Sequence, residues 1–266
     1  MYKSNNKIIN NSYCENKAIT DFNLWVLTPS NSWSNYAFVF WGFVCVTIGF
    51  KDVFRRHEIY ASEVSNQIKK NPEWMIFHGF SLIYGGCGSF AFHAGYTDMG
   101  HLLDITGVFS MLGYPTVYAF FNFFLEDLNR YFVIGDGLSK IIAFTAFGFN
   151  IWLGFWITAK RKELGVPSDV WLGLMAGTLI SGIILKAIKE ELLIALLINR
   201  NFYYINMWLL PLALLSFTLA AICQENILKD LWGPLYCDPK GILQAHACWH
   251  MFSAFSLFIS MYIFYT

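Results

Sequence analysis

Long apolar stretches alternate with short polar segments along most of the chain. A helix that crosses a bilayer needs about 20 mostly apolar residues, and seven stretches approach that length. The segments between them carry nearly all the charges and most of the prolines and asparagines. The pattern predicts an all-α, polytopic membrane protein, a seven-transmembrane helix bundle with spans near residues 33–50, 74–95, 102–125, 141–158, 170–185, 202–222 and 242–265.

The fifth stretch leaves an alternative topology open. Its apolar run stops at Lys186 and resumes at Leu192. Residues 187–198 therefore either extend the helix or lie along the membrane surface. A bundle with six spans is the alternative that this region allows.

The first 32 residues differ from the rest of the chain. This polar N-terminal arm, residues 1–32, is rich in asparagine and has no apolar core near residue 10, so we expect no cleaved signal peptide. We find no internal repeat and no linker long enough to divide the remainder. The chain is therefore expected to consist of the arm and one membrane domain, residues 33–266.

Composition agrees with a membrane location and excludes one class of partner. Hydrophobic residues make up 56% of the chain and charged residues 14%, whereas soluble globular proteins have about 45–50% and about 25%. The 18 basic and 18 acidic residues cancel, which excludes the basic surface of a nucleic-acid-binding protein. Basic residues of the loops are divided almost evenly between the two sides, with a slight excess opposite the arm. This weakly favours an N-terminus outside the cytosol.

Polar residues inside the predicted spans gather at one membrane depth. With seven spans, the end of the second and the starts of the third and seventh all lie on the side of the arm. Two pairs spaced i,i+4 each project from one helix face. We expect five side chains to converge there: Ser89, His93, Asp104, His246 and His250.

Three converging imidazoles with one open position are a typical catalytic zinc site. A carboxylate such as Asp104 could orient or deprotonate the attacking water, and the Ser89 hydroxyl could hydrogen-bond to it or to a developing oxyanion. Histidines within membrane helices also occur as ordinary core residues. Spacing alone leaves that alternative open.

The order of these residues resembles the alkaline ceramidase family. The order is Ser-x-x-x-His, then Asp eleven residues after that His, then His-x-x-x-His at the start of the last helix. Together with adiponectin-receptor-like proteins, that family forms a superfamily of seven-helix membrane hydrolases. Further similarities are the Tyr-Cys-Glu-Asn run at residues 13–16, the Asn-Ser-Trp-Ser-Asn run at 31–35 and the Cys-Gln-Glu run at 223–225.

The resemblance implies that residues 33–266 are a ceramidase-like domain that hydrolyses the amide of ceramide to a sphingoid base and a fatty acid. Zinc would be held by His93, His246 and His250, with Asp104 as general base and then acid and Ser89 at the oxyanion. The substrate would be a ceramide-like lipid of the bilayer. An endomembrane location, in the endoplasmic reticulum or Golgi, follows from the family, and another membrane such as the mitochondrial inner membrane stays open.

The family also carries a calcium site in the arm, from which this chain departs. The family run Asp-Trp-Cys-Glu reads Ser-Tyr-Cys-Glu here, and the position of a later family Glu falls near Thr28. Glu15, Asn16 and Asp21 are the candidate calcium ligands that remain. Calcium prefers six to eight oxygens, several from carboxylates. We therefore expect no well-formed calcium cage.

The resemblance further pairs the arm cysteine with the one that closes the sixth helix, which gives a Cys14–Cys223 disulfide over the site. With seven spans, Cys14, Cys223 and Cys237 all lie on the same side of the membrane as the site. A disulfide among them therefore requires that this side be oxidising.

A second class of function also fits the sequence. The chain could be an accessory subunit that keeps the ceramidase fold, with or without zinc, and packs against neighbouring subunits of a larger membrane assembly. Polar chain ends such as the arm are usually disordered unless they are held, and neighbouring subunits of such an assembly could hold this one. Three converging imidazoles argue against complete loss of the site, because a purely structural subunit has no physical need for them.

Overall fold

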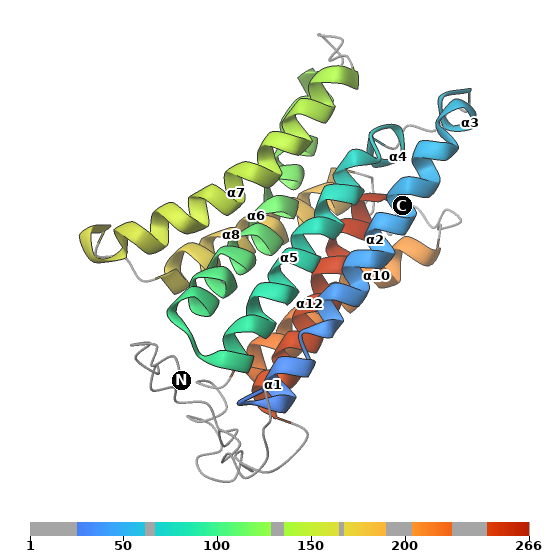
Figure 1. Cartoon of the computed structure of the whole chain (residues 1–266). Coiled ribbons are helices and arrows are strands. Elements are labelled where there is room, and N and C mark those ends of the chain that lie inside the picture. Colours follow the sequence, from blue (N-terminus) through green and yellow to red (C-terminus); the bar gives the residue numbers. More distant parts are fainter. Residues whose placement is uncertain are drawn as a thin grey trace.

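The computed structural model describes residues 26–61, 67–128, 136–164, 168–189, 204–224 and 244–265, and the regular structure within these ranges is helical (Figure 1). The all-α prediction is therefore confirmed for this part of the chain. Cys14, Glu15, Asn16 and Asp21 lie outside the described residues. The absence of a calcium cage thus stays a prediction.

Each predicted span overlaps helical residues of the structure, although the predicted spans 202–222 and 242–265 begin before α10 and α12 do. The first span is covered by a short helix and the longer one that follows it, α1 and α2. The helix bounds are α1 Pro29–Trp33, α2 Tyr36–Phe54, α3 Arg56–Ala61, α4 Gln67–Lys70, α5 Glu73–Gly95, α6 Asp98–Leu128, α7 Asp136–Leu164, α8 Ser168–Lys189, α10 Tyr204–Cys223 and α12 Ala245–Tyr265.

Four helical segments among the described residues are long and apolar enough to cross a bilayer. They are Pro29–Phe54, Glu73–Gly95, Gly137–Lys160 and Ala245–Tyr265. The apolar parts of α8 and α10, Gly173–Leu185 and Trp208–Cys223, are shorter. These helices support a membrane protein, whereas the count of seven spans stays a prediction.

Helix α5 packs directly against both α2 and α6, and α2, α5 and α12 run alongside one another (Figure 1). Glycines allow the close approach. A Cβ added at Gly42 of α2 would lie 2.8 Å from the carbonyl oxygen of Gly79, and one at Gly107 of α6 would lie 2.6 Å from the Cα of Gly85. Small residues at such crossings let membrane helices pack backbone to backbone. The position of α5 is therefore set by two neighbours.

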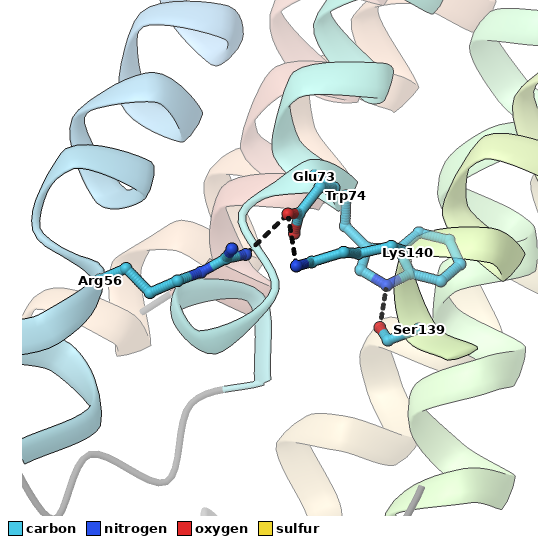
Figure 2. A network of polar contacts seen from close by, with 5 residues as sticks. All are labelled: Arg56, Glu73, Trp74, Ser139 and Lys140. Atoms are coloured by element: carbon cyan, nitrogen blue, oxygen red, sulfur yellow. Dashed lines mark hydrogen bonds and ion pairs between the residues drawn. The ribbon is translucent and has the colours of Figure 1, made fainter. Parts of the chain in front are cut away.

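The first turn of α5 is held by polar contacts to two other helices (Figure 2). The Glu73 carboxylate forms an ion pair with the Arg56 guanidinium of α3 at 2.6 Å. The same carboxylate oxygen lies 3.8 Å from the Lys140 ammonium of α7. Next to it, the Trp74 indole N–H donates a hydrogen bond of 3.1 Å to the hydroxyl of Ser139. These contacts fix the end of α5 that lies opposite His93.

Candidate metal centre

Three histidines from two helices come together at one end of the bundle. His93 lies in the last turn of α5, and His246 and His250 lie in the first two turns of α12. One ring nitrogen from each lies within 4.8 Å of the other two, and the Nε2 atoms of His93 and His246 are 3.1 Å apart. His93 and His250 are buried, and His246 is partly buried. The predicted convergence of the three imidazoles is therefore confirmed.

The distance between His93 and His246 fits a shared metal ion, and His250 lies within reach of the same point. Two nitrogens bound to zinc at about 2.0–2.1 Å in tetrahedral geometry lie about 3.3 Å apart, close to the 3.1 Å between His93 and His246. The Nε2 of His250 is buried and makes no hydrogen bond with the described residues. A buried imidazole nitrogen without a partner is costly, and metal binding would satisfy it. Three nitrogen ligands leave a fourth position open.

Helix α5 ends directly after His93 because of a left-handed residue. Tyr96 has φ 47° and ψ 42°, a conformation that bulky side chains rarely adopt. Its ring is buried, and its hydroxyl lies 3.2 Å from the hydroxyl of Thr28. The chain thus turns sharply, and α6 begins at Asp98. The start of α6 therefore lies at the same level as the end of α5.

Ser89, one helical turn before His93, contacts Asp104 of α6. Ser89 is 3% exposed, and its hydroxyl donates a hydrogen bond to the Asp104 carboxylate. The close approach of the two backbones at Gly88 allows this, since a Cβ there would lie 2.6 Å from the carbonyl oxygen of Leu103. Asp104 is not a member of the three-histidine group, and its role as a base stays a prediction.

An apolar cavity of about 420 Å³ adjoins the histidines. Trp249 lines it and stacks on the His246 ring at 5.0 Å between centroids, and Phe38 lines it and lies 6.1 Å from the His250 ring. Side chains of five helices form its walls, among them Val108, Met111, Phe217 and Leu257. The three-histidine group and this apolar cavity are thus connected through the rings of Trp249 and Phe38.

Two further histidine contacts come from residues that the sequence analysis did not assign to the site. The Thr28 hydroxyl donates a 2.8 Å hydrogen bond to the backbone carbonyl of His93, and the Ser34 hydroxyl lies 2.8 Å from Nδ1 of His250. For Ser34, the sequence offered one signal, the polar run at residues 31–35. That run entered the sequence analysis only as part of the family resemblance.

The predicted Cys14–Cys223 disulfide stays a prediction, because one of its two cysteines lies outside the described residues. Cys223 is a free thiol, and its side chain hydrogen-bonds with Cys248 of α12. Helix α10 lies along α12, which places the end of α10 against that helix. The other predicted partner, Cys14, lies outside the described residues.

No family model, curated protein or solved structure matches the chain. The family resemblance therefore rests on the motif residues themselves, and what it implies about activity and cofactor is a proposal.

Proposed function

We propose that the protein is a zinc-dependent intramembrane amidase that hydrolyses ceramide, or a related lipid amide, to a sphingoid base and a fatty acid. The observation that carries the proposal is the group formed by His93, His246 and His250, with nitrogen atoms within 4.8 Å of one another. The adjoining apolar cavity supports a lipid substrate. Ligand pockets are usually mostly apolar with a few polar groups that orient the ligand.

The three histidines would hold the metal. When bound in such a site, zinc polarises a carbonyl and makes water acidic enough to act as a nucleophile near neutral pH. His250 is already oriented by its hydrogen bond to Ser34, and the backbone of His93 by Thr28. The ligands are therefore held in place by the surrounding chain.

Asp104 would move the proton that hydrolysis requires. As water adds to the amide carbon, the carboxylate would take a proton from it and then give it to the nitrogen as the C–N bond breaks. The Ser89 hydroxyl, now directed at Asp104, would orient this carboxylate or donate to the oxyanion that forms on the substrate. The products are a free amine and a carboxylic acid.

The cavity would take part of the lipid chain. Its walls are apolar, and Trp249 and Phe38 connect it to the rings of His246 and His250. A chain lying there would bring the amide, at the polar end of the lipid, toward the three imidazoles.

The test uses the full chain purified in detergent without chelators. We expect zinc to copurify and a fluorescent ceramide to be cleaved, with both lost in His93→Ala, His246→Ala and His250→Ala, because two imidazoles bind zinc weakly. His78→Asn is the matched control, since His78 is a buried histidine of the same helix outside the group. It should keep its zinc.

Two results would contradict the proposal. Zinc-loaded wild-type protein that cleaves no ceramide or related lipid amide would favour the accessory subunit of a larger assembly. Wild-type protein that binds no zinc would refute the metal assignment itself.

A further inference from the structure

We propose that Ser34 is a positioning residue that fixes the tautomer and ring orientation of His250, so that its Nε2 is ready to bind metal. The inference rests on the metal centre of the proposed function. Ser34 lies between α1 and α2, and His250 lies 216 residues later on α12. Their contact joins the entry of the membrane domain to its last helix.

The hydrogen bonds of Ser34 determine which histidine nitrogen carries the proton. Its hydroxyl donates to the backbone carbonyl of Asn31 at 3.0 Å and lies 2.8 Å from Nδ1 of His250. A serine hydroxyl has one proton. Because the Asn31 carbonyl can only accept, both contacts are satisfied when Ser34 donates to Asn31 and accepts from His250, and this arrangement places the hydrogen of His250 on Nδ1.

This assignment leaves the lone pair of His250 on Nε2. A neutral imidazole has one N–H and one bare nitrogen, and the bare nitrogen is the metal ligand. Nε2 of His250 is buried and has no hydrogen-bond partner among the described residues. It belongs to a group in which each histidine offers one ring nitrogen. Hydrogen bonds to the second nitrogen of a metal-binding histidine commonly set its tautomer and orientation.

The acceptor of the Ser34 proton is itself held firmly. The Asn31 carbonyl also accepts a 2.8 Å hydrogen bond from the side-chain amide of Asn35, and both asparagines are buried. The backbone N–H of Ser34 donates to the carbonyl of Ser30 at 3.0 Å. The acceptor and the backbone of Ser34 are therefore both held in place beside His250.

A neighbouring serine provides the comparison. Ser32 is fully buried in the same short helix, but its hydroxyl makes no hydrogen bond with the residues that the structure describes. Ser32→Ala and Ser34→Ala thus remove the same kind of atom at positions two residues apart, one within α1 and one at its C-cap. Of the two hydroxyls, the one on Ser34 contacts a candidate metal ligand.

The experiment measures zinc affinity of the purified full chain by competition with a chromophoric chelator, and the absorption spectrum of the Co²⁺-loaded protein. We expect Ser34→Ala to bind zinc about 10- to 100-fold more weakly and to show an altered Co²⁺ spectrum. Ser32→Ala should match wild type. Ser34→Thr, which keeps the hydroxyl, should restore affinity, whereas the nearly isosteric Ser34→Val should not.

The Thr and Val variants keep the test decisive if Ser34→Ala folds poorly, since they differ only in the hydroxyl. Equal zinc affinity and equal Co²⁺ spectra for these two variants would overturn the role of Ser34 while leaving the metal centre intact. Wild-type protein that binds neither Zn²⁺ nor Co²⁺ would overturn both this inference and the proposed function.

Discussion

The hydroxyl of Thr28 donates a 2.8 Å hydrogen bond to the backbone carbonyl of His93. The last four carbonyls of a helix have no partner within the helix, and α5 ends at Gly95. The backbone N–H of Leu27 satisfies a second such carbonyl, that of Ala94, at 3.0 Å. The segment before α1 therefore caps the helix that presents His93.

Thr28→Val should weaken this cap at nearly constant side-chain volume. The His93 carbonyl would lose a buried hydrogen bond, which costs about 1–3 kcal/mol. We expect a lower free energy of unfolding and a weaker affinity for zinc, measured by thermal unfolding with and without the metal. Thr178→Val is the control, because that hydroxyl donates to Leu174 within an exposed stretch of α8. Equal loss of stability in the two variants would argue against a specific cap.

Asp104→Asn and Ser89→Ala should separate catalysis from metal binding. Neither residue belongs to the three-histidine group, so zinc content should stay at the wild-type level. Turnover of a fluorescent ceramide should fall about 10²–10⁴-fold in Asp104→Asn, as is typical for loss of a general acid–base. Ser89→Ala should cost less, because the metal would stabilise most of the oxyanion charge. Loss of zinc in Asp104→Asn would instead identify Asp104 as a ligand.

Gly88→Ala should disturb the contact between α5 and α6 at the level of Ser89 and Asp104. The added Cβ would lie 2.6 Å from the carbonyl oxygen of Leu103, so the two backbones must separate. We expect about 1–3 kcal/mol of lost stability and reduced turnover with zinc retained. Gly148→Ala in α7 meets nothing within 4 Å, and alanine there should stabilise the helix by about 0.5–1 kcal/mol. Matching unfolding curves for the two variants would refute the close packing.

Glu73→Gln should loosen the opposite end of α5 without affecting the metal. Glu73 is 20% exposed and pairs with Arg56 and Lys140, so its neutralisation should cost about 1 kcal/mol. Thermal unfolding should show the loss, and zinc affinity should not change. Glu58→Gln removes an ion pair to Arg55 that is more than half exposed, and its effect should be close to zero. A drop in zinc affinity in Glu73→Gln would show that the two ends of α5 are coupled.

The sequence predicted the features that depend on local spacing. Helices follow from apolar stretches of sufficient length. The pair His246 and His250 shares a face because the residues are four apart. Parity of the spans brought His93 to the same end. These inferences require no knowledge of how one helix packs against another. The three-histidine group bears out the convergence, whereas the count of spans behind the parity argument stays a prediction.

Contacts between distant residues could not be predicted in this way. Thr28 and His93 are 65 residues apart, and Ser34 and His250 are 216 apart. Each contact depends on the rotation of a helix about its own axis, which hydrophobic patterns fix only coarsely. The contact of Cys223 with Cys248 is of the same kind, because it is set by the packing of α10 on α12.

The position of the histidines at the ends of α5 and α12 has a topological consequence. A centre at the ends of membrane helices receives water from one face of the bilayer only. Amides of lipids in the nearer leaflet would reach it directly, whereas those of the farther leaflet would first have to flip across. In sealed vesicles with a slowly flipping lipid amide, such an enzyme would consume half of the substrate quickly and then slow to the rate of lipid exchange between leaflets.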